Sequence, residues 1–109
     1  MQIDVSPMQG ATMLKPYGDV DMSVARELQG ALHQALRQKP DRLIVNLEEV
    51  AYMDSSGVAT LVEAMQIARK GKTNVVLCNL QERVRSIFEI ARLDRVFKIA
   101  ASPDDAMTN

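Results

Sequence analysis

Short apolar runs alternate with amphipathic stretches along most of the chain. Two five-residue runs, 43–47 and 74–78, are apolar almost throughout, as is typical of strands buried on both faces of a parallel sheet. Around them, apolar residues recur at intervals of three and four, the spacing of one face of a helix. This pattern predicts helices over residues 24–38, 55–70 and 81–92.

The two ends of the chain add shorter elements. Near the N-terminus, residues 3–5 and 12–15 favour two strands joined by a turn, and Pro16 then marks a strand end, an edge or a bulge because it has no N–H to donate. Near the C-terminus, residues 96–99 favour a short edge strand. The Ser-Pro pair at 102–103 is typical of an N-cap followed by the first residue of a helix.

Alternation of apolar strands with amphipathic helices places the chain in the α/β class. We expect a mostly parallel central sheet of four to five strands, with an antiparallel N-terminal strand and about four helices packed on it. The helical crossovers should be right-handed. We expect residues 1–109 to form a single domain, because this length can bury a core without a metal or a disulfide.

Composition and charge argue against several classes of partner. A net charge of −1 gives no electrostatic reason to bind nucleic acid or an anionic membrane. No apolar run is long enough to span a bilayer. The first residues lack the pattern of a signal peptide, and Cys78 has no second cysteine to pair with, so we expect a cytoplasmic protein.

Conventional catalysis has little support among the reactive side chains. The only histidine, His33, falls between the apolar positions of a helix, and Cys78 ends an apolar strand, where a small buried hydrophobe is the expected role. Neither glycine-rich phosphate loop is present. We therefore expect no metal and no cofactor. A small metal-dependent or nucleotide-hydrolysing enzyme remains an alternative, and it would use the loop carboxylates Asp19, Asp21, Glu48, Glu49 and Asp54.

Two serines stand where a strand passes into a helix. Asp54, Ser55, Ser56 and Gly57 follow the strand at 43–47 and open the next helix. Unpaired backbone N–H groups and the helix dipole favour an anion at such a helix N-terminus. A hydroxyl there can cap the helix or accept a phosphate. From these considerations alone, Ser55 and Ser56 are equally good acceptors.

The pattern as a whole resembles the STAS domain, and specifically the bacterial anti-sigma factor antagonists. Residues 18–21, Gly-Asp-Val-Asp, look like the Gly-Glu-Leu-Asp turn of that family, and residues 43–50 look like its strand and acidic turn. Met-Asp-Ser-Ser-Gly at 53–57 is close to the family's phosphorylation motif. Two stretches differ: 57–59 is Gly-Val-Ala where the family usually has Gly-Leu-Gly, and Lys-Pro-Tyr at 15–17 replaces the usual strand residues.

This resemblance implies a regulatory binding protein that is not an enzyme. In the family, the serine directly after the aspartate accepts phosphate from a partner that is both kinase and anti-sigma factor, which implies Ser55 as the acceptor. The unphosphorylated protein would bind this anti-sigma factor serine kinase and so free a sigma factor, and a serine phosphatase could reverse the switch. The implied partner-binding residues are Asp19, Asp21, Asp54, Ser55, Ser56, Gly57 and Val58.

A related branch of the family suggests a second function. Its members are accessory subunits bound to the ATPase of lipid-transport ABC systems, and their motif often continues Gly-Leu-Ala. Ala59 fits that branch slightly better. In such a subunit the same loop would dock constitutively and phosphorylation of a serine would have no role.

Overall fold

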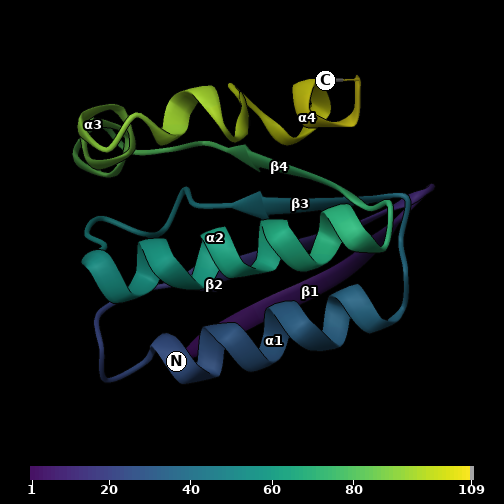
Figure 1. The fold of residues 1–109 in the computed structure, drawn as a ribbon, viewed down its shortest axis with the longest axis horizontal. Helices are drawn as coiled ribbons and strands as arrows, with labels where there is room; N and C mark the ends of the chain where they lie inside the picture. Colours follow the sequence, from purple (N-terminus) through teal and green to yellow (C-terminus); the bar gives the residue numbers. More distant parts are fainter. Residues whose placement is uncertain (109) are drawn as a thin grey trace.

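A five-stranded sheet forms the centre of the protein, and the computed structural model describes residues 1–108 (Figure 1). The strands lie in chain order across the sheet, with β1 antiparallel to β2 and all other neighbours parallel. Their bounds are β1 Gln2–Met8, β2 Ala11–Tyr17, β3 Arg42–Asn46, β4 Asn74–Cys78 and β5 Lys98–Ala100. The predicted mixed sheet with an antiparallel N-terminal strand is confirmed.

Four helices connect and cover the strands. Their bounds are α1 Ala25–Arg37, α2 Ser55–Lys70, α3 Glu82–Ile90 and α4 Pro103–Thr108, and a short 3₁₀ helix, η1, spans Leu93–Arg95. In Figure 1, α1 and α2 run side by side across one face of the sheet. In the part of the chain that the structure describes, none of these helices has the length and apolar character needed to cross a membrane.

Pro16 can lie in β2 because the pairing of β2 with β3 stops before it. It is the second-last residue of β2 and lies opposite Ile3 of β1. Pairing between β2 and β3 ends earlier, at Leu14 opposite Val45. The residue without an N–H therefore stands beyond the ladder with β3, close to the predicted strand end.

The C-terminal strand begins later than the sequence predicts. We expected residues 96–99, whereas β5 starts at Lys98, after η1. Phe97 is buried in the core, where its ring meets that of Phe88 edge-on at 5.6 Å between centroids. Packing of this aromatic pair, which only the folded chain brings together, sets where the strand can begin.

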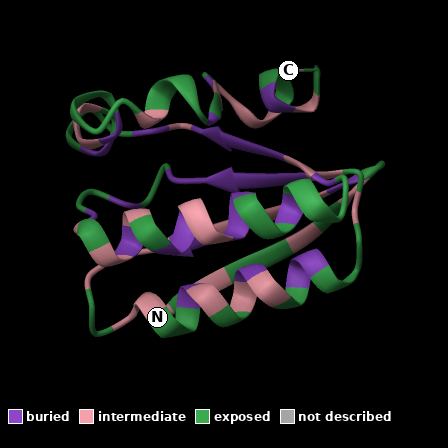
Figure 2. Cartoon of the chain, in the orientation of Figure 1, coloured by how far each residue is buried: buried purple, intermediate pink, exposed green. Residues whose placement is uncertain are grey.

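Two apolar layers lie on opposite faces of the sheet, and alternation along the central strands supplies both. In β3, Leu43 and Val45 belong to the larger core under the helices, whereas Ile44 belongs to the smaller core that α4 covers. Figure 2 shows β3 and β4 buried along most of their length. The larger core includes the fully buried Leu14, Leu28, Leu32, Leu61, Leu77 and Phe88.

Cys78 has the expected role of a core residue. It lies in the smaller core, fully buried. Burial raises the pKa of its thiol to about 11, so the thiol stays protonated at neutral pH. A protonated, buried thiol is a poor nucleophile.

Candidate functional site

The start of α2 carries the two serines, and Asp54 is its N-cap. The Asp54 Oδ1 atom accepts hydrogen bonds from the Ser56 N–H at 2.9 Å and from the Gly57 N–H at 3.3 Å. An N-cap side chain normally bonds the amides two and three residues on, and this one does so. The cap fixes the direction in which the first residue of the helix points.

Ser55 and Ser56 have different surroundings. The Ser56 hydroxyl donates to Asp54 Oδ1 at 2.5 Å and is half-buried. The Ser55 side chain is exposed, and among residues 1–108 its hydroxyl has no hydrogen-bond partner. The structure therefore distinguishes two serines that the sequence alone left equivalent.

The cap also keeps a negative charge beside Ser55. The Ser56 hydroxyl, followed by the amides of Gly57, Ser56 and Met22, holds the pKa of the Asp54 carboxyl below its ordinary value of 3.8. These donors all favour the ionised form. At neutral pH the residue next to Ser55 is therefore a carboxylate, at the helix end that attracts anions.

Two loops meet at this end of the molecule and fix each other. The Val20 N–H donates to the Tyr52 carbonyl at 2.9 Å, and the Asp54 N–H donates to the Val20 carbonyl at 3.0 Å. Val20 and Met53 form an isolated parallel bridge, and both are fully buried. The turn with Asp19 and Asp21 is thereby held beside the segment that leads to Ser55.

Asp21 acts in a turn and does not cap α1. Its Oδ1 atom accepts from the Ser23 amide at 2.9 Å and from the Ser23 hydroxyl at 2.5 Å. The sequence predicts that Asp21 or Ser23 caps this helix, and this prediction is wrong, because the N-cap of α1 is Val24, which makes no side-chain cap bond. Asp21 and Ser23 thus form an Asx turn that is complete before α1 begins. Met22, which was not singled out from the sequence, is 79% exposed beside this turn.

Gly57 serves the packing of α2 against this pair of loops. A Cβ atom on Gly57 would lie 2.6 Å from Met53 Cγ and 2.8 Å from Val20 Cγ1. Only glycine allows the first turn of α2 to approach so closely. Gly57 is buried and Val58 is half-buried, so of these two Val58 has the side chain that a partner could contact.

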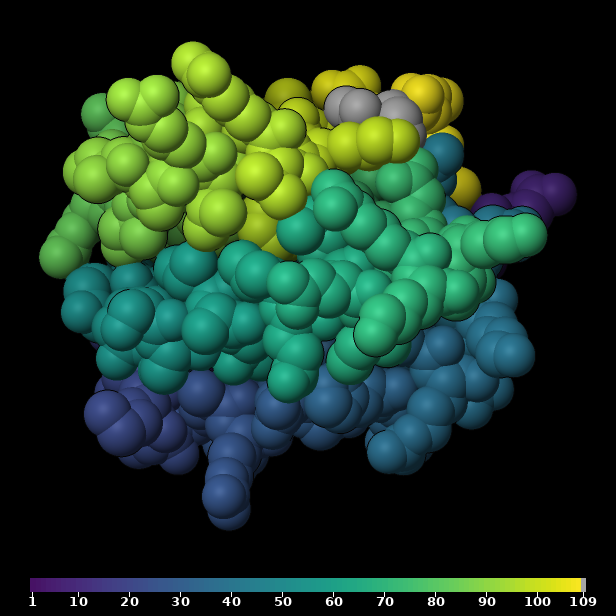
Figure 3. All heavy atoms as spheres, in the orientation of Figure 1, coloured from purple at the N-terminus to yellow at the C-terminus, as the bar shows by residue number. Residues whose placement is uncertain are grey.

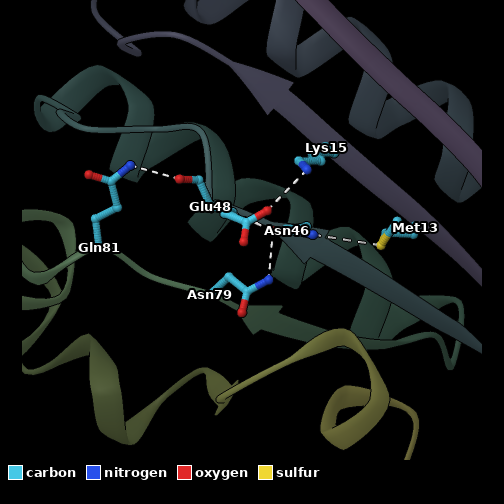
Figure 4. Close-up of polar contacts among 6 residues, drawn as sticks. All are labelled: Met13, Lys15, Asn46, Glu48, Asn79 and Gln81. Atoms are coloured by element: carbon cyan, nitrogen blue, oxygen red, sulfur yellow. Dashed lines mark hydrogen bonds and ion pairs between the residues drawn. The ribbon is translucent and has the colours of Figure 1, made fainter.

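A polar cluster at the ends of β2, β3 and β4 holds the loop that follows β3 (Figure 4). The buried Asn46 accepts from the Glu48 N–H at 3.0 Å and from Asn79 Nδ2 at 3.2 Å. Gln81 Nε2 donates to the Glu48 carbonyl at 2.7 Å, and Lys15 Nζ lies 3.2 Å from Glu48 Oε1. Glu48 is therefore fixed through its amide, its carbonyl and its carboxylate.

Most of this cluster was not predicted from the sequence. Glu48 was considered only as a loop carboxylate, and neither Asn46 nor Gln81 was singled out. The available signal was an asparagine at the end of an otherwise apolar strand, since a buried amide needs partners. In the described chain, no three histidine, cysteine or acidic side chains converge as a set of metal ligands.

An apolar hollow of about 830 Å³ begins at Ser55 and runs between α2 and α3. Val58, Ala59 and Val62 form the α2 side, and Ile87 and Ala91 form the α3 side. Figure 3 shows these two parts of the chain bordering one another on one face of the molecule. Tyr52 closes one part of the rim, with Arg83 above its ring at 5.8 Å. The exposed serine thus stands beside a surface suited to a protein partner.

Comparison with known proteins agrees with the geometry. The family model for the STAS domain matches residues 2–106. The anti-sigma-B factor antagonist of Listeria monocytogenes is 32% identical over 82 residues, which is 75% of this chain and 72% of the relative.

Solved structures share the fold. A crystal structure of an anti-sigma factor antagonist from Mycobacterium paratuberculosis aligns with a TM-score of 0.90 at 22% identity, over 98% of this chain and 91% of that one. The Bacillus cell fate determinant SpoIIAA in its phosphorylated form aligns with a TM-score of 0.74 at 19% identity, over 98% and 97%. From its match over almost its whole length and from its curated relatives, we conclude that this chain belongs to the STAS-domain family of anti-sigma factor antagonists.

Proposed function

We propose that this protein is a partner-switching regulator with Ser55 as its phosphorylated residue. Unphosphorylated, it binds an anti-sigma factor serine kinase and so frees the sigma factor that the kinase would otherwise hold. Phosphorylation of Ser55 ends this binding. The observation that carries the proposal is the exposed hydroxyl of Ser55 at the N-terminus of α2, which has no hydrogen-bond partner in the described part of the chain.

The docking surface consists of three neighbouring parts. These are the turn with Asp19 and Asp21, the start of α2 from Asp54 to Val58, and the apolar hollow between α2 and α3. The hollow supplies apolar area to bury, whereas the carboxylates set which partners are attracted. Membership in the antagonist family favours this function over an accessory subunit of a transporter.

For phosphoryl transfer, this chain has only to present the Ser55 hydroxyl to the kinase in the right orientation. The Ser55 Oγ attacks the γ-phosphorus of ATP held by the kinase, and the bond between that phosphorus and the ADP oxygen breaks. The hydroxyl proton passes to a base that the kinase supplies. Because the Ser55 hydroxyl has no hydrogen bond to residues 1–108 to break, it can enter the active site of the kinase.

The added phosphate suits the monomer and opposes the complex. It brings about −1.5 to −2 charges at neutral pH. The N-terminus of α2 stabilises an anion by roughly 0.3–1 kcal/mol, so the fold tolerates the change. In the complex, the phosphate would be buried against the partner beside the Asp54 carboxylate, and an uncompensated buried charge costs several kcal/mol. A loss of about 3 kcal/mol weakens binding roughly a hundredfold. A serine phosphatase would restore the binding form.

Mapping the phosphate tests the assignment. The protein is incubated with its cognate kinase and ATP, and the modified residue is located by mass spectrometry. We expect one phosphate on Ser55. The Ser56→Ala variant should still be modified, because both amides that bond Asp54 remain, whereas Ser55→Ala should not be. Phosphate on Ser56 or on another residue would show that the assignment is wrong.

A further inference from the structure

The ends of α1 and α2 meet at the side of the molecule away from Ser55. A second hollow, of about 330 Å³, lies between them. Leu36 and Ile67 give it apolar walls, and His33, Arg37, Lys39 and Gly71 complete the lining. Because Ile67 follows Ser55 by 12 residues along α2 at 1.5 Å each, the α2 wall of this hollow is about 18 Å from Ser55.

Two basic side chains, Arg37 and Lys39, line this second hollow, and Arg69, Lys70 and Lys72 flank its lining residue Gly71 in the sequence. Within the described residues, none of these cations has a carboxylate partner, and all are exposed. The nearby Glu63 is already engaged by Gln29 and His33, which leaves Asp41 as the acidic residue in the adjoining segment. We call this set the basic surface; it consists of Arg37, Lys39, Arg69, Lys70 and Lys72.

The helix dipole explains only part of the basic surface. Arg37, Arg69 and Lys70 lie in the last turns of their helices, where a cation is favourable. Lys39 and Lys72 lie beyond the helix ends, at φ values of 51° and 63°. In this left-handed region glycine is the favoured residue and a side chain is strained. At both helix ends a lysine therefore occupies a position that glycine would suit better.

We propose that the basic surface is a second docking site, and that it binds an acidic segment of a protein partner. The segment presents an apolar side chain to the hollow, flanked by carboxylates that meet the rim. Charge complementarity with the unpaired cations carries this assignment. The apolar part is recessed, so a flat bilayer would reach the cations without filling the hollow. Because the site is far from Ser55, a partner bound here leaves the serine accessible.

Two labelled peptides test this site: Asp-Glu-Leu-Glu-Asp, and the same peptide with glycine in place of leucine. We expect the leucine peptide to bind more tightly, with an affinity that falls as salt is added. The double variant Lys39→Glu, Lys72→Glu should bind it on the order of tenfold or more weakly. The control Arg26→Glu, Arg85→Glu reverses two exposed arginines outside the basic surface and should bind like the wild type.

A glycine variant separates docking from folding. Lys39→Gly with Lys72→Gly relieves the left-handed strain, so the thermal midpoint should be kept or raised while peptide binding weakens. Equal affinity of the wild type and the Lys39→Glu, Lys72→Glu variant would overturn the proposal. Tighter binding of the wild type to phosphatidylserine vesicles than to the leucine peptide would also overturn it. Self-association of the wild type that the Lys39→Glu, Lys72→Glu variant abolishes would do the same. None of these outcomes depends on whether Ser55 is phosphorylated.

Discussion

Ser55 and Ser56 are neighbours at the start of α2, yet their hydroxyl groups have different hydrogen bonds and point in different directions. The cap at Asp54 bonds the second and third amides of α2, which brings the Ser56 hydroxyl against the same carboxylate oxygen. Ser55, as the first helical residue, is left pointing to solvent. The sequence predicted the helix start and the cap, but the choice between the hydroxyls depended on side-chain directions that only the structure supplies.

The pH dependence of stability tests the Asp54 cap. Because hydrogen bonds from the Ser56 hydroxyl and the backbone lower the folded-state pKa, the ionised carboxylate stabilises the fold. This contribution is complete above the ordinary pKa of 3.8 and is lost as the pH falls through the lower folded value. In urea denaturation at a series of acid pH values, the wild type should lose stability relative to Asp54→Asn, whose amide oxygen still caps the helix.

Ser56→Ala provides the matched control for the Asp54 cap. It removes the largest cause of the lowered pKa and keeps both amide donors. Its acid-induced loss of stability should therefore be smaller than that of the wild type. If the wild type and Asp54→Asn keep a constant difference in unfolding free energy over this pH range, the carboxylate is not stabilised as described.

At the scale of elements, strong periodicity was enough to predict α1, α2, α3 and the two central strands. The residues at which the elements begin and end were harder to predict. The sequence predicts Gly71 as the C′ residue of α2, a position that is often left-handed, yet its φ is −93° and Lys72 takes the left-handed conformation instead. Near the C-terminus, η1 delays β5 because Phe97 turns into the core. Both differences come from packing that local propensity does not contain.

Two glycines give opposite predictions for the same substitution. Gly57→Ala should lower the free energy of unfolding by about 1–3 kcal/mol, because the new methyl group overlaps Met53 and Val20. Gly30→Ala should raise it by about 0.5–1 kcal/mol, because this exposed position within α1 has no atom within 4 Å of a new Cβ. Chemical denaturation of the two variants beside the wild type measures both.

The same pair of variants separates packing from helix propensity. If α2 could shift to admit a methyl group, both substitutions would be neutral or stabilising. A Gly57→Ala variant as stable as the wild type would therefore mean that the close approach between α2 and the two loops is not required. A loss for Gly57→Ala beside a gain for Gly30→Ala would support the approach seen in the structure.

Across the whole molecule, the alternation of strands and helices was enough to predict that the loop carboxylates lie at the strand-to-helix ends of the sheet. Parallel strands end at one edge of a sheet, so the turn at residues 18–21 and the serine motif had to lie near each other. The sequence could not predict the Asn46 cluster, the hollow between α2 and α3, or the basic surface. Each of these depends on side chains from segments far apart in the chain, such as Glu48 and Gln81.

Binding to the kinase is the property that the proposed switch must change. Four proteins are compared by calorimetry against the cognate anti-sigma factor kinase: the wild type, its Ser55-phosphorylated form, Ser55→Ala and Ser55→Asp. A fifth, Gln9→Asp, places a charge on the exposed turn between β1 and β2 and serves as a control. We predict that the wild type, Ser55→Ala and Gln9→Asp bind alike, that phosphorylation weakens binding roughly a hundredfold, and that Ser55→Asp weakens it in the same direction. Equal affinity of the phosphorylated and unphosphorylated proteins would contradict the account.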